Sequence, residues 1–313
     1  MLDWEERRKL VKVANLYYFE GWTQSQVAKK MGVSRPIVSK LLQKAKDAGI
    51  VEIYIKDENA HTVDLEQQLE DKFKLKDVVV VPTHGYTDER SKRAVARAGA
   101  YYLSRNLGDH EKLGISWGTT LSYFVDEFPF KRHEGIIIVP LEGGMGRKYV
   151  EIHANQLAYE LAKKLNGKCS YLYAPAIVET EELKARLLEM TDIKAVLEEG
   201  RQVDRALIGI GNPHQNSTLE KIGYLKDHDL EHLDAMGAVG DIGYRFFDGN
   251  GAPIKDSINE KVIGIPLEDL RGIKEVIGIV EGKHKAESIL GALNGRFLDV
   301  LIIDEETASS LLT

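Results

Sequence analysis

The sequence predicts a protein of the α/β class in two parts. We expect a winged helix-turn-helix over residues 1–57 and a Rossmann-like domain with a mainly parallel sheet over residues 77–313. Three observations predict this. Two short capped helices follow each other before residue 50, and the basic N-terminal part precedes an acidic remainder. From Asp77 onward, short apolar runs alternate with helical patterns, which is typical of a parallel sheet covered on both faces.

The first predicted helix covers residues 5–20. Its apolar positions, among them Leu10, Val13 and Tyr17, recur at helical spacing, and its Lys and Arg residues lie on the other side. We expect this helix to pack behind the two that follow.

The helical pair between residues 23 and 47 is marked at each end. Thr23 and Gln26 have the spacing of a capping box, and Gly32 can end the first helix in the left-handed conformation. Ser34 can cap the second helix, and Pro36 is tolerated in its first turn. Helix, short turn and helix is the arrangement that places a second helix in the major groove of DNA.

The second helix has an apolar face and a polar, basic one. After Gly49, alternation over residues 51–56 predicts the strand of a wing. A surface helical hairpin of another function could carry the same caps, but the caps, the turn glycine and the strand together favour DNA binding. We expect the contacts to double-stranded DNA to come from Thr23, Gln24, Ser34, Arg35, Pro36, Ser39, Lys40, Gln43 and Lys44.

The net charge of −7 is unevenly distributed. Residues 1–56 contain eleven Lys and Arg against six Asp and Glu, and the remaining residues contain thirty-one against forty-three. A balance of +5 followed by one of −12 is the asymmetry expected when one end of a protein meets phosphates.

Cysteine content and apolar runs limit the protein class. The single cysteine, Cys169, excludes an intrachain disulfide and cysteine-based zinc sites, which fits a reducing compartment. The charged N-terminus predicts no signal peptide, and no apolar run has the roughly 20 residues that span a bilayer. We therefore expect a cytoplasmic protein without a membrane partner.

Residues 58–76 form the predicted join, with an amphipathic helix over residues 63–75. Val63, Leu65, Leu69 and Phe73 make its apolar stripe. The stripe could dock on its own domain or form a dimer seam, and the pattern does not separate the two.

Apolar runs after Asp77 predict six strands, at residues 78–81, 113–116, 136–139, 206–210, 276–280 and 300–303. Ligands of such sheets bind beyond the carboxyl ends of the strands. The segments that follow these ends are rich in glycine, at residues 117–120, 142–144, 211–213 and 282–285, with a further loop at 240–241.

These segments share a chemistry suited to a phosphorylated polyhydroxy compound. Gly118, Thr119 and Thr120 open a helix, so backbone N–H groups and two hydroxyls meet where the helix dipole favours an anion. Lys285 can counter a phosphate charge, and Asp241 can accept hydrogen bonds from sugar hydroxyls. Glycines after strands are also ordinary turn residues, so the prediction depends on the loops taken together.

At these motifs the chain resembles the SorC/DeoR-type bacterial transcriptional regulators over essentially its whole length. The motifs are SRPIVSKLL, GISWGTT, LEGG followed by ANQLA, GIGNP, GDIGYRFFD and KHKAESILGAL. The resemblance implies a winged helix-turn-helix joined to an effector domain similar to sugar-phosphate isomerases and deaminases. It also implies a phosphosugar effector and assembly as a homodimer or homotetramer. The basic N-terminal part favours regulation over catalysis, so we expect no enzyme activity and no cofactor.

Carried onto this chain, the resemblance assigns the phosphate loop to Gly118, Thr119 and Thr120, the hydroxyl reader to Asp241 and the phosphate-side lysine to Lys285. With the loop analysis, the predicted effector site comprises Gly118, Thr119, Thr120, Glu142, Gly143, Gly144, His153, Asn155, Gly211, Asn212, Asp241 and Lys285.

Two positions depart from the family pattern. Glu142 stands where relatives carry a basic or neutral residue, including a lysine that bonds covalently to its sugar phosphate, and Glu281 stands where glycine is usual. A carboxylate at position 142 beside a bound sugar predicts that a monophosphate is preferred over a bisphosphate, because like charges repel.

Two enzyme classes and one metal site are the alternatives. Residues 114–118 match the G-x-S-x-G motif of hydrolases, but at most one strand of the domain precedes Ser116, and no oxyanion-hole loop precedes it. A sugar-phosphate isomerase would share the fold, and the sequence alone does not exclude it. His228 and His232 have a spacing that can bind zinc, although a charged surface helix explains them as well, and we predict no metal.

Overall fold

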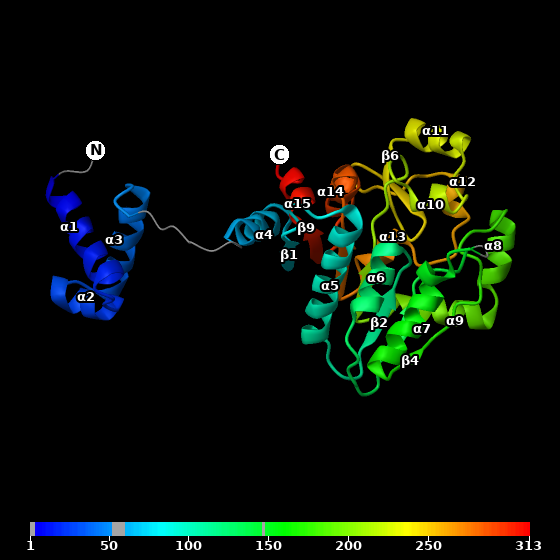
Figure 1. The fold of residues 1–313 in the computed structure, drawn as a ribbon, viewed down its shortest axis with the longest axis horizontal. Coiled ribbons are helices and arrows are strands. Elements are labelled where there is room, and N and C mark those ends of the chain that lie inside the picture. The colour runs from blue at the N-terminus through cyan, green and yellow to red at the C-terminus, as the bar shows by residue number, and fades with distance from the viewer. Residues whose placement is uncertain (1–3, 52–59, 146–147) are drawn as a thin grey trace. The chain divides into compact units, whose positions relative to one another are not determined.

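The computed structural model describes residues 4–51, 60–145 and 148–313. The chain divides into two compact units, Met1–Ala60 and His61–Thr313 (Figure 1). Within the described ranges, no helix is both long and apolar enough to cross a membrane.

The first unit is a small helical bundle. Its elements are α1 (Trp4–Ala14), the π-helical turn η1 (Asn15–Phe19), α2 (Gln24–Met31) and α3 (Arg35–Asp47). The predicted helix over residues 5–20 is therefore α1 together with η1. The core of the bundle joins apolar side chains of all four elements: Val13, Leu16, Val27, Ala28, Val38 and Leu42. The predicted wing strand covers residues 51–56, of which residues 52–56 lie outside the described ranges.

The ends of α2 follow the predicted capping, whereas one cap of α3 does not. Gln26 N–H donates to Thr23 Oγ1, and Thr23 N–H donates to Gln26 Oε1 at 2.8 Å, which completes the capping box. Gly32 ends α2 with φ of 67°. Ser34 occupies the N-cap position of α3, but its hydroxyl makes no capping hydrogen bond, so the predicted side-chain cap is wrong.

The second unit is built on a parallel sheet of seven strands in the order β1-β9-β8-β5-β2-β3-β4. The strands are β1 (Asp77–Val81), β2 (Lys112–Ile115), β3 (Ile137–Pro140), β4 (Lys168–Cys169), β5 (Arg205–Ile208), β8 (Glu275–Val280) and β9 (Val300–Asp304). The six predicted strands are all present, because each contains a run of apolar residues. The central strands β8 and β9 are buried along their whole length, whereas Val79 and Val81 of β1 are only partly buried. The antiparallel hairpin of β6 (Ala238–Ile242) and β7 (Arg245–Asp248) lies outside this sheet.

Helices cover both faces of the sheet (Figure 1). The helices of this unit are α4 (Ala60–Phe73), α5 (Asp88–Asn106), α6 (Thr119–Glu127), α7 (Ala154–Leu165), α8 (Glu181–Leu188), α9 (Thr191–Arg201), α10 (Thr218–Lys221), α11 (Asp227–Ala235), α12 (Ser257–Glu260), α13 (Leu267–Leu270), α14 (Ala286–Asn294) and α15 (Glu305–Ser310), with short 3-10 turns η2 (Val150–Ile152) and η3 (Lys283–Lys285). Of these, α11 and α12 contact the hairpin of β6 and β7. Alternate strand residues serve the two faces: Ile277 packs with α5, α6 and α7, whereas Val276 packs with α4 and α14.

The apolar stripe of α4 belongs to the second unit. Leu65 and Leu69 are buried in the same core as Val78 and Val80 of β1. Val63 remains 47% exposed. Of the two alternatives for this stripe, docking on its own domain therefore explains the burial of Leu65 and Leu69.

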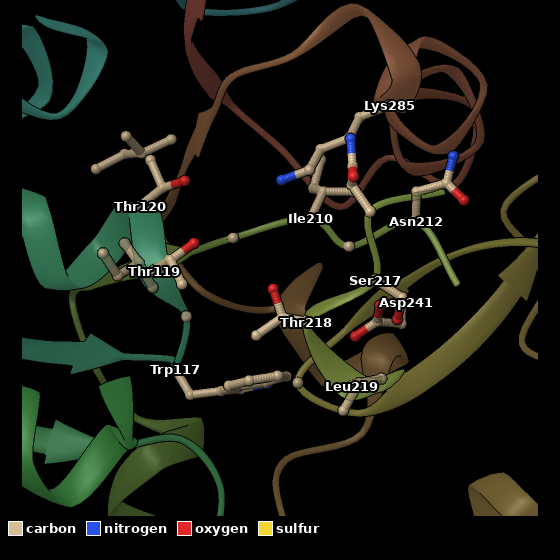
Figure 2. A pocket seen from close by; sticks show the side chains of 17 residues that line it. Trp117, Thr119, Thr120, Ile210, Asn212, Ser217, Thr218, Leu219, Asp241 and Lys285 are labelled. Atoms are coloured by element: carbon tan, nitrogen blue, oxygen red, sulfur yellow. The ribbon is translucent and has the colours of Figure 1, made fainter. Parts of the chain in front are cut away.

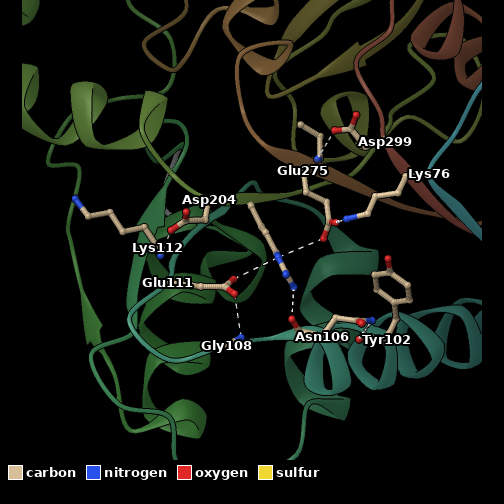
Figure 3. Close-up of polar contacts among 11 residues, drawn as sticks. Lys76, Tyr102, Asn106, Gly108, Glu111, Lys112, Asp204, Glu275 and Asp299 are labelled. Atoms are coloured by element: carbon tan, nitrogen blue, oxygen red, sulfur yellow. Dashed lines mark hydrogen bonds and ion pairs between the residues drawn. The ribbon is translucent and has the colours of Figure 1, made fainter.

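A network of ion pairs closes the amino edge of the sheet (Figure 3). Buried Glu275, at the start of β8, pairs with Lys76 and with Arg205 Nε at 3.3 Å. The same Arg205 Nε lies 3.3 Å from Glu111 Oε2. These contacts tie the amino ends of neighbouring strands together, opposite the edge at which ligands of parallel sheets bind.

Candidate functional site

A cavity lies at the carboxyl edge of the sheet, where β2, β5 and β8 end (Figure 2). It is lined by Trp117, Gly118, Thr119, Thr120, Leu121, Gly209, Ile210, Gly211, Asn212, Asn216, Ser217, Thr218, Leu219, Asp241, Gly243, Ile279 and Lys285. Of the twelve predicted effector residues, the structure brings seven together here: Gly118, Thr119, Thr120, Gly211, Asn212, Asp241 and Lys285.

The N-terminus of α6 forms one wall of the cavity. Gly118 caps the helix with φ of 133°, a conformation that side chains rarely adopt, and its N–H donates to Ile152 O at 2.9 Å. The next residues, Thr119 and Thr120, begin the helix with N–H groups that lack an intrahelical partner. Figure 2 shows both threonine side chains beside the cavity. This wall therefore offers backbone N–H groups and a favourable helix dipole to an anion.

Asp241 lies in β6, not in a loop as the sequence predicted. An exchange of main-chain hydrogen bonds with Gly211 holds the strand against the segment after β5. Gly240 and Gly243 interrupt the apolar pattern, which hides this hairpin in the sequence. The Asp241 side chain is buried at the cavity, and burial raises its pKa to about 7, although Lys285 acts in the opposite direction.

Lys285 comes from η3, after β8. Burial lowers the pKa of its ammonium group to about 8, and the charge of Lys92 adds to this effect. Figure 2 shows the lysine reaching into the cavity on the side of Thr119 and Thr120. An anionic ligand at this point would offset the cost of keeping the ammonium group charged.

Asn212 organises the loop that faces the threonines. Its Nδ2 donates to His284 O at 2.6 Å, and its Oδ1 accepts from the N–H groups of His214 and Gln215. The side chain thus joins the segment after β5 to the turn that carries Lys285, and its polar atoms already have protein partners.

Glu142 is not among the residues that line this cavity. Its buried carboxyl accepts a hydrogen bond from Ser116 Oγ at 2.9 Å and one from the Trp117 N–H. The Trp117 ring stacks on Tyr244, with ring centroids 4.4 Å apart. Burial raises the pKa of Glu142 to about 8. The carboxyl therefore supports the segment that carries Trp117, and its place gives no support to the predicted direct repulsion of a second phosphate.

The other four predicted residues also lie away from the cavity. A side chain at Gly143 would meet Ala174 O at 2.5 Å, so this glycine serves close backbone packing, and the neighbouring Gly144 N–H donates to the same oxygen. Asn155 exchanges two hydrogen bonds with the Leu172 main chain, each 2.9 Å long. His153 is buried at the start of α7, and burial lowers its pKa.

The chain matches the family model described as "Putative sugar-binding domain" over residues 57–313. It is 33% identical to the deoxyribonucleoside regulator of Bacillus subtilis over 99% of both chains. It also matches the structure of the full-length sorbitol operon regulator SorC of Klebsiella pneumoniae, with 32% identity, a TM-score of 0.79 and coverage of 99% of this chain and 100% of that one. A DeoR family transcriptional regulator from Listeria monocytogenes is 42% identical, with a TM-score of 0.76, over 80% of this chain and 99% of that one.

The chain belongs to the SorC/DeoR-type family of sugar-binding transcriptional regulators. Its curated relatives and structural neighbours are transcriptional regulators, so the expectation of a regulator rather than an enzyme is confirmed.

The geometry of Ser116 agrees with this membership. In a hydrolase the serine hydroxyl would be bonded to a histidine base. In this regulator it is buried and donates to Glu142. Among the described residues there is no cluster of three or more His, Cys, Asp and Glu that could hold a metal ion, and His232 pairs with Asp256 at 3.0 Å.

Sequence reasoning missed the part of the cavity formed by the loop after Asn212. The loop residues are Asn216, Ser217, Thr218 and Leu219. The other lining residues that were not among the twelve predicted ones are Trp117, Leu121, Gly209, Ile210, Gly243 and Ile279. Ser217 caps α10 by accepting from Glu220 N–H, and Asn216 has φ of 53°. The Asn-Ser-Thr run at 216–218 is the signal that could have found this loop.

In the first unit, the predicted DNA-binding residues of α3 are mostly exposed. They are Arg35, Pro36, Ser39, Lys40 and Gln43, with Ser34 at the N-cap. Lys44 is also exposed but pairs with Glu6 of α1. The hydroxyl of Thr23 is engaged in the capping box, and Gln24, the first residue of α2, is half-buried.

Proposed function

We propose that this regulator binds operator DNA through α3 and is controlled by a phosphorylated sugar or polyol held in the cavity of the second unit. The observation that carries the proposal is that a helix N-terminus and a lysine, both favourable to an anion, line one cavity. Lys285 reaches toward the N-terminus of α6, and both line the same space as the buried carboxyl of Asp241.

Each element has a separate role in this account. A phosphate accepts hydrogen bonds from the N–H groups and hydroxyls of Thr119 and Thr120, while Lys285 supplies the counter charge. Asp241 accepts hydrogen bonds from the hydroxyls of the sugar. Lys285→Ala should then cost about 1.5–3 kcal/mol of binding free energy. Asp241→Asn should change the preference among sugars.

The proposal also covers the oligomeric state of the protein and the compartment in which it acts. One helix-turn-helix contacts only a short half-site, so tight DNA binding requires at least a dimer, as inferred from the resemblance. Light scattering of the full chain tests this directly. We expect a transcriptional regulator with a single cysteine to act in the cytoplasm.

Operator binding measured with and without sugar phosphates tests the proposed function. We expect one member of a pentose, hexose and polyol phosphate panel to change the gel-shift midpoint of the full chain. Lys285→Ala should need a higher concentration of that compound, while Arg35→Ala should weaken DNA binding with and without it. If no phosphorylated compound changes DNA binding, and none binds the protein, the proposal is wrong.

A further inference from the structure

The cavity that contains Lys285 opens into a second, larger hollow. The two share Thr119, Asn216, Thr218 and Lys285. The inner cavity has a volume of about 50 Å³ and the outer one about 680 Å³. The inner space therefore has room for only a few water-sized groups. A sugar whose phosphate is held by α6 therefore keeps the hydroxyls nearest its phosphate beside Asp241 and extends its distant end into the outer hollow.

Two buried carboxyl groups, those of Asp304 and Glu281, line this outer hollow. Both oxygens of Asp304 already accept hydrogen bonds from the protein. Asp304 Oδ1 accepts from Thr307 N–H at 2.9 Å, and its Oδ2 accepts from Thr307 Oγ1 and from Gly282 N–H. This carboxylate caps α15. It has little capacity left for a ligand.

Glu281, the other buried carboxyl group, accepts no such hydrogen bonds from the described residues. The residue is 6% exposed. Among the described residues, the polar partner of its carboxylate is Lys92 of α5, whose Nζ lies 3.9 Å from Glu281 Oε2, too far for a hydrogen bond. Both carboxylate oxygens can still accept hydrogen bonds. Burial raises the pKa of Glu281, and Lys92 opposes this shift.

A hydroxyl can bridge the Glu281 carboxylate and the Lys92 ammonium group from the side of the hollow, and a phosphate is disfavoured there. The hydroxyl hydrogen can be donated to the carboxylate, while the hydroxyl oxygen accepts from the ammonium group. A phosphate would meet the carboxylate at close range with both groups charged, and the ammonium group is already neutralised by its partner.

We propose that Glu281, paired with Lys92, selects effectors whose end distant from the phosphate carries a free hydroxyl and excludes those with a second phosphate there. The inference deepens the proposed function, because it rests on a phosphate held by α6. It also assigns to Glu281, which lines the outer hollow, the preference for a monophosphate that the sequence predicted for Glu142.

Titration calorimetry of the full chain tests this proposal with matched ligands, fructose 6-phosphate and fructose 1,6-bisphosphate. We expect the wild type to bind the monophosphate at least tenfold more tightly. Glu281→Gln should reduce this ratio at least tenfold, because it frees Lys92 for the second phosphate. Adding Lys92→Gln should remove the gain in bisphosphate affinity.

Glu306→Gln is the matched control. Glu306 lines the same hollow and pairs with Lys283 at 3.5 Å, but it is exposed. Its removal changes the net charge of the rim without changing the buried wall, so the ratio of affinities should stay within twofold of the wild type. Glu281→Gly serves as a second variant if the glutamine variant has a lowered melting temperature.

The outcomes separate this inference from the proposed function. If the wild type binds a monophosphate but Glu281→Gln leaves the ratio unchanged, or if the wild type prefers the bisphosphate, the role of Glu281 is wrong and the phosphate site stands. If no monophosphate of the pentose, hexose and polyol panel binds, the phosphate site itself is absent and both proposals fail. A lowered ratio in Glu281→Gln, reversed by Lys92→Gln, supports the assignment.

Discussion

The main chains of Gly211 and Asp241 exchange two hydrogen bonds, with N–O distances of 2.9 and 3.1 Å. This exchange joins the end of β5 to the hairpin of β6 and β7, and it places a carboxyl group in the cavity. A Cβ atom at position 211 would lie 2.0 Å from Asp241 Oδ1. The close approach therefore requires glycine at this position.

Gly211→Ala should destabilise the protein and displace Asp241. The added methyl group forces a shift of buried groups, which typically costs about 1–3 kcal/mol. Gly209→Ala is a matched control in the same segment, because its Cβ would meet only Trp117 O at 3.7 Å. Melting temperatures of the ligand-free proteins check this. Equal losses in the two variants would contradict the packing argument.

Arg35→Ala should lower operator affinity by about 1–3 kcal/mol if the side chain reads a base, and the loss should depend on the DNA sequence. Lys40→Ala should weaken all sequences alike and reduce the salt dependence if it meets a phosphate. Gel shifts at two salt concentrations with operator and unrelated DNA distinguish the two. Lys44 has a partner in Glu6, so Lys44→Ala should have a smaller effect.

Effector affinity should fall as the pH rises from 7 to 9, because the phosphate is already a dianion over this range and Lys285 loses its proton with a pKa of about 8. If only the charged lysine binds, the loss is about tenfold. Lys285→Ala should flatten this dependence. Calorimetry at the two pH values measures it, and an equally steep fall in the variant would assign the titration to another group.

Glu142 should be protonated at pH 7, because its pKa is raised to about 8. A carboxyl whose folded pKa is raised contributes stability that is fully present below its unfolded pKa and is lost as the pH rises through about 8. Glu142→Gln should make the fall in melting temperature between pH 5 and 8 shallower. Glu142→Ala should cost about 1–3 kcal/mol at pH 7, because Ser116 and the Trp117 N–H lose their acceptor. Glu198→Gln, a surface substitution, should leave the pH profile unchanged.

The parallel sheet could be predicted from the sequence, because each main strand is a continuous apolar run such as residues 276–280. The two-residue β4 is too short to give a pattern, and glycines disguise the hairpin that carries Asp241.

The candidate site could be predicted where residues suited to bind a phosphate directly follow a predicted strand, as at Gly118–Thr120 and Lys285. It was not predictable at Gly143, because a glycine needed for backbone packing has the same sequence signature as one that approaches a ligand. The position of the Glu142 side chain depends on Ser116, twenty-six residues earlier in the chain, and no local pattern reports such a contact.

Thermal unfolding of the full chain with phosphorylated sugars, each beside its unphosphorylated parent, tests the central claim most directly. A ligand that binds only the folded state raises the melting temperature, by an amount set by its concentration relative to Kd. We predict that at least one sugar or polyol monophosphate raises the melting temperature of the wild type, that its parent sugar at the same concentration does not, and that Lys285→Ala reduces the shift. An equal shift from the unphosphorylated sugar would contradict the account, because the cavity beside α6 would then not be reading a phosphate.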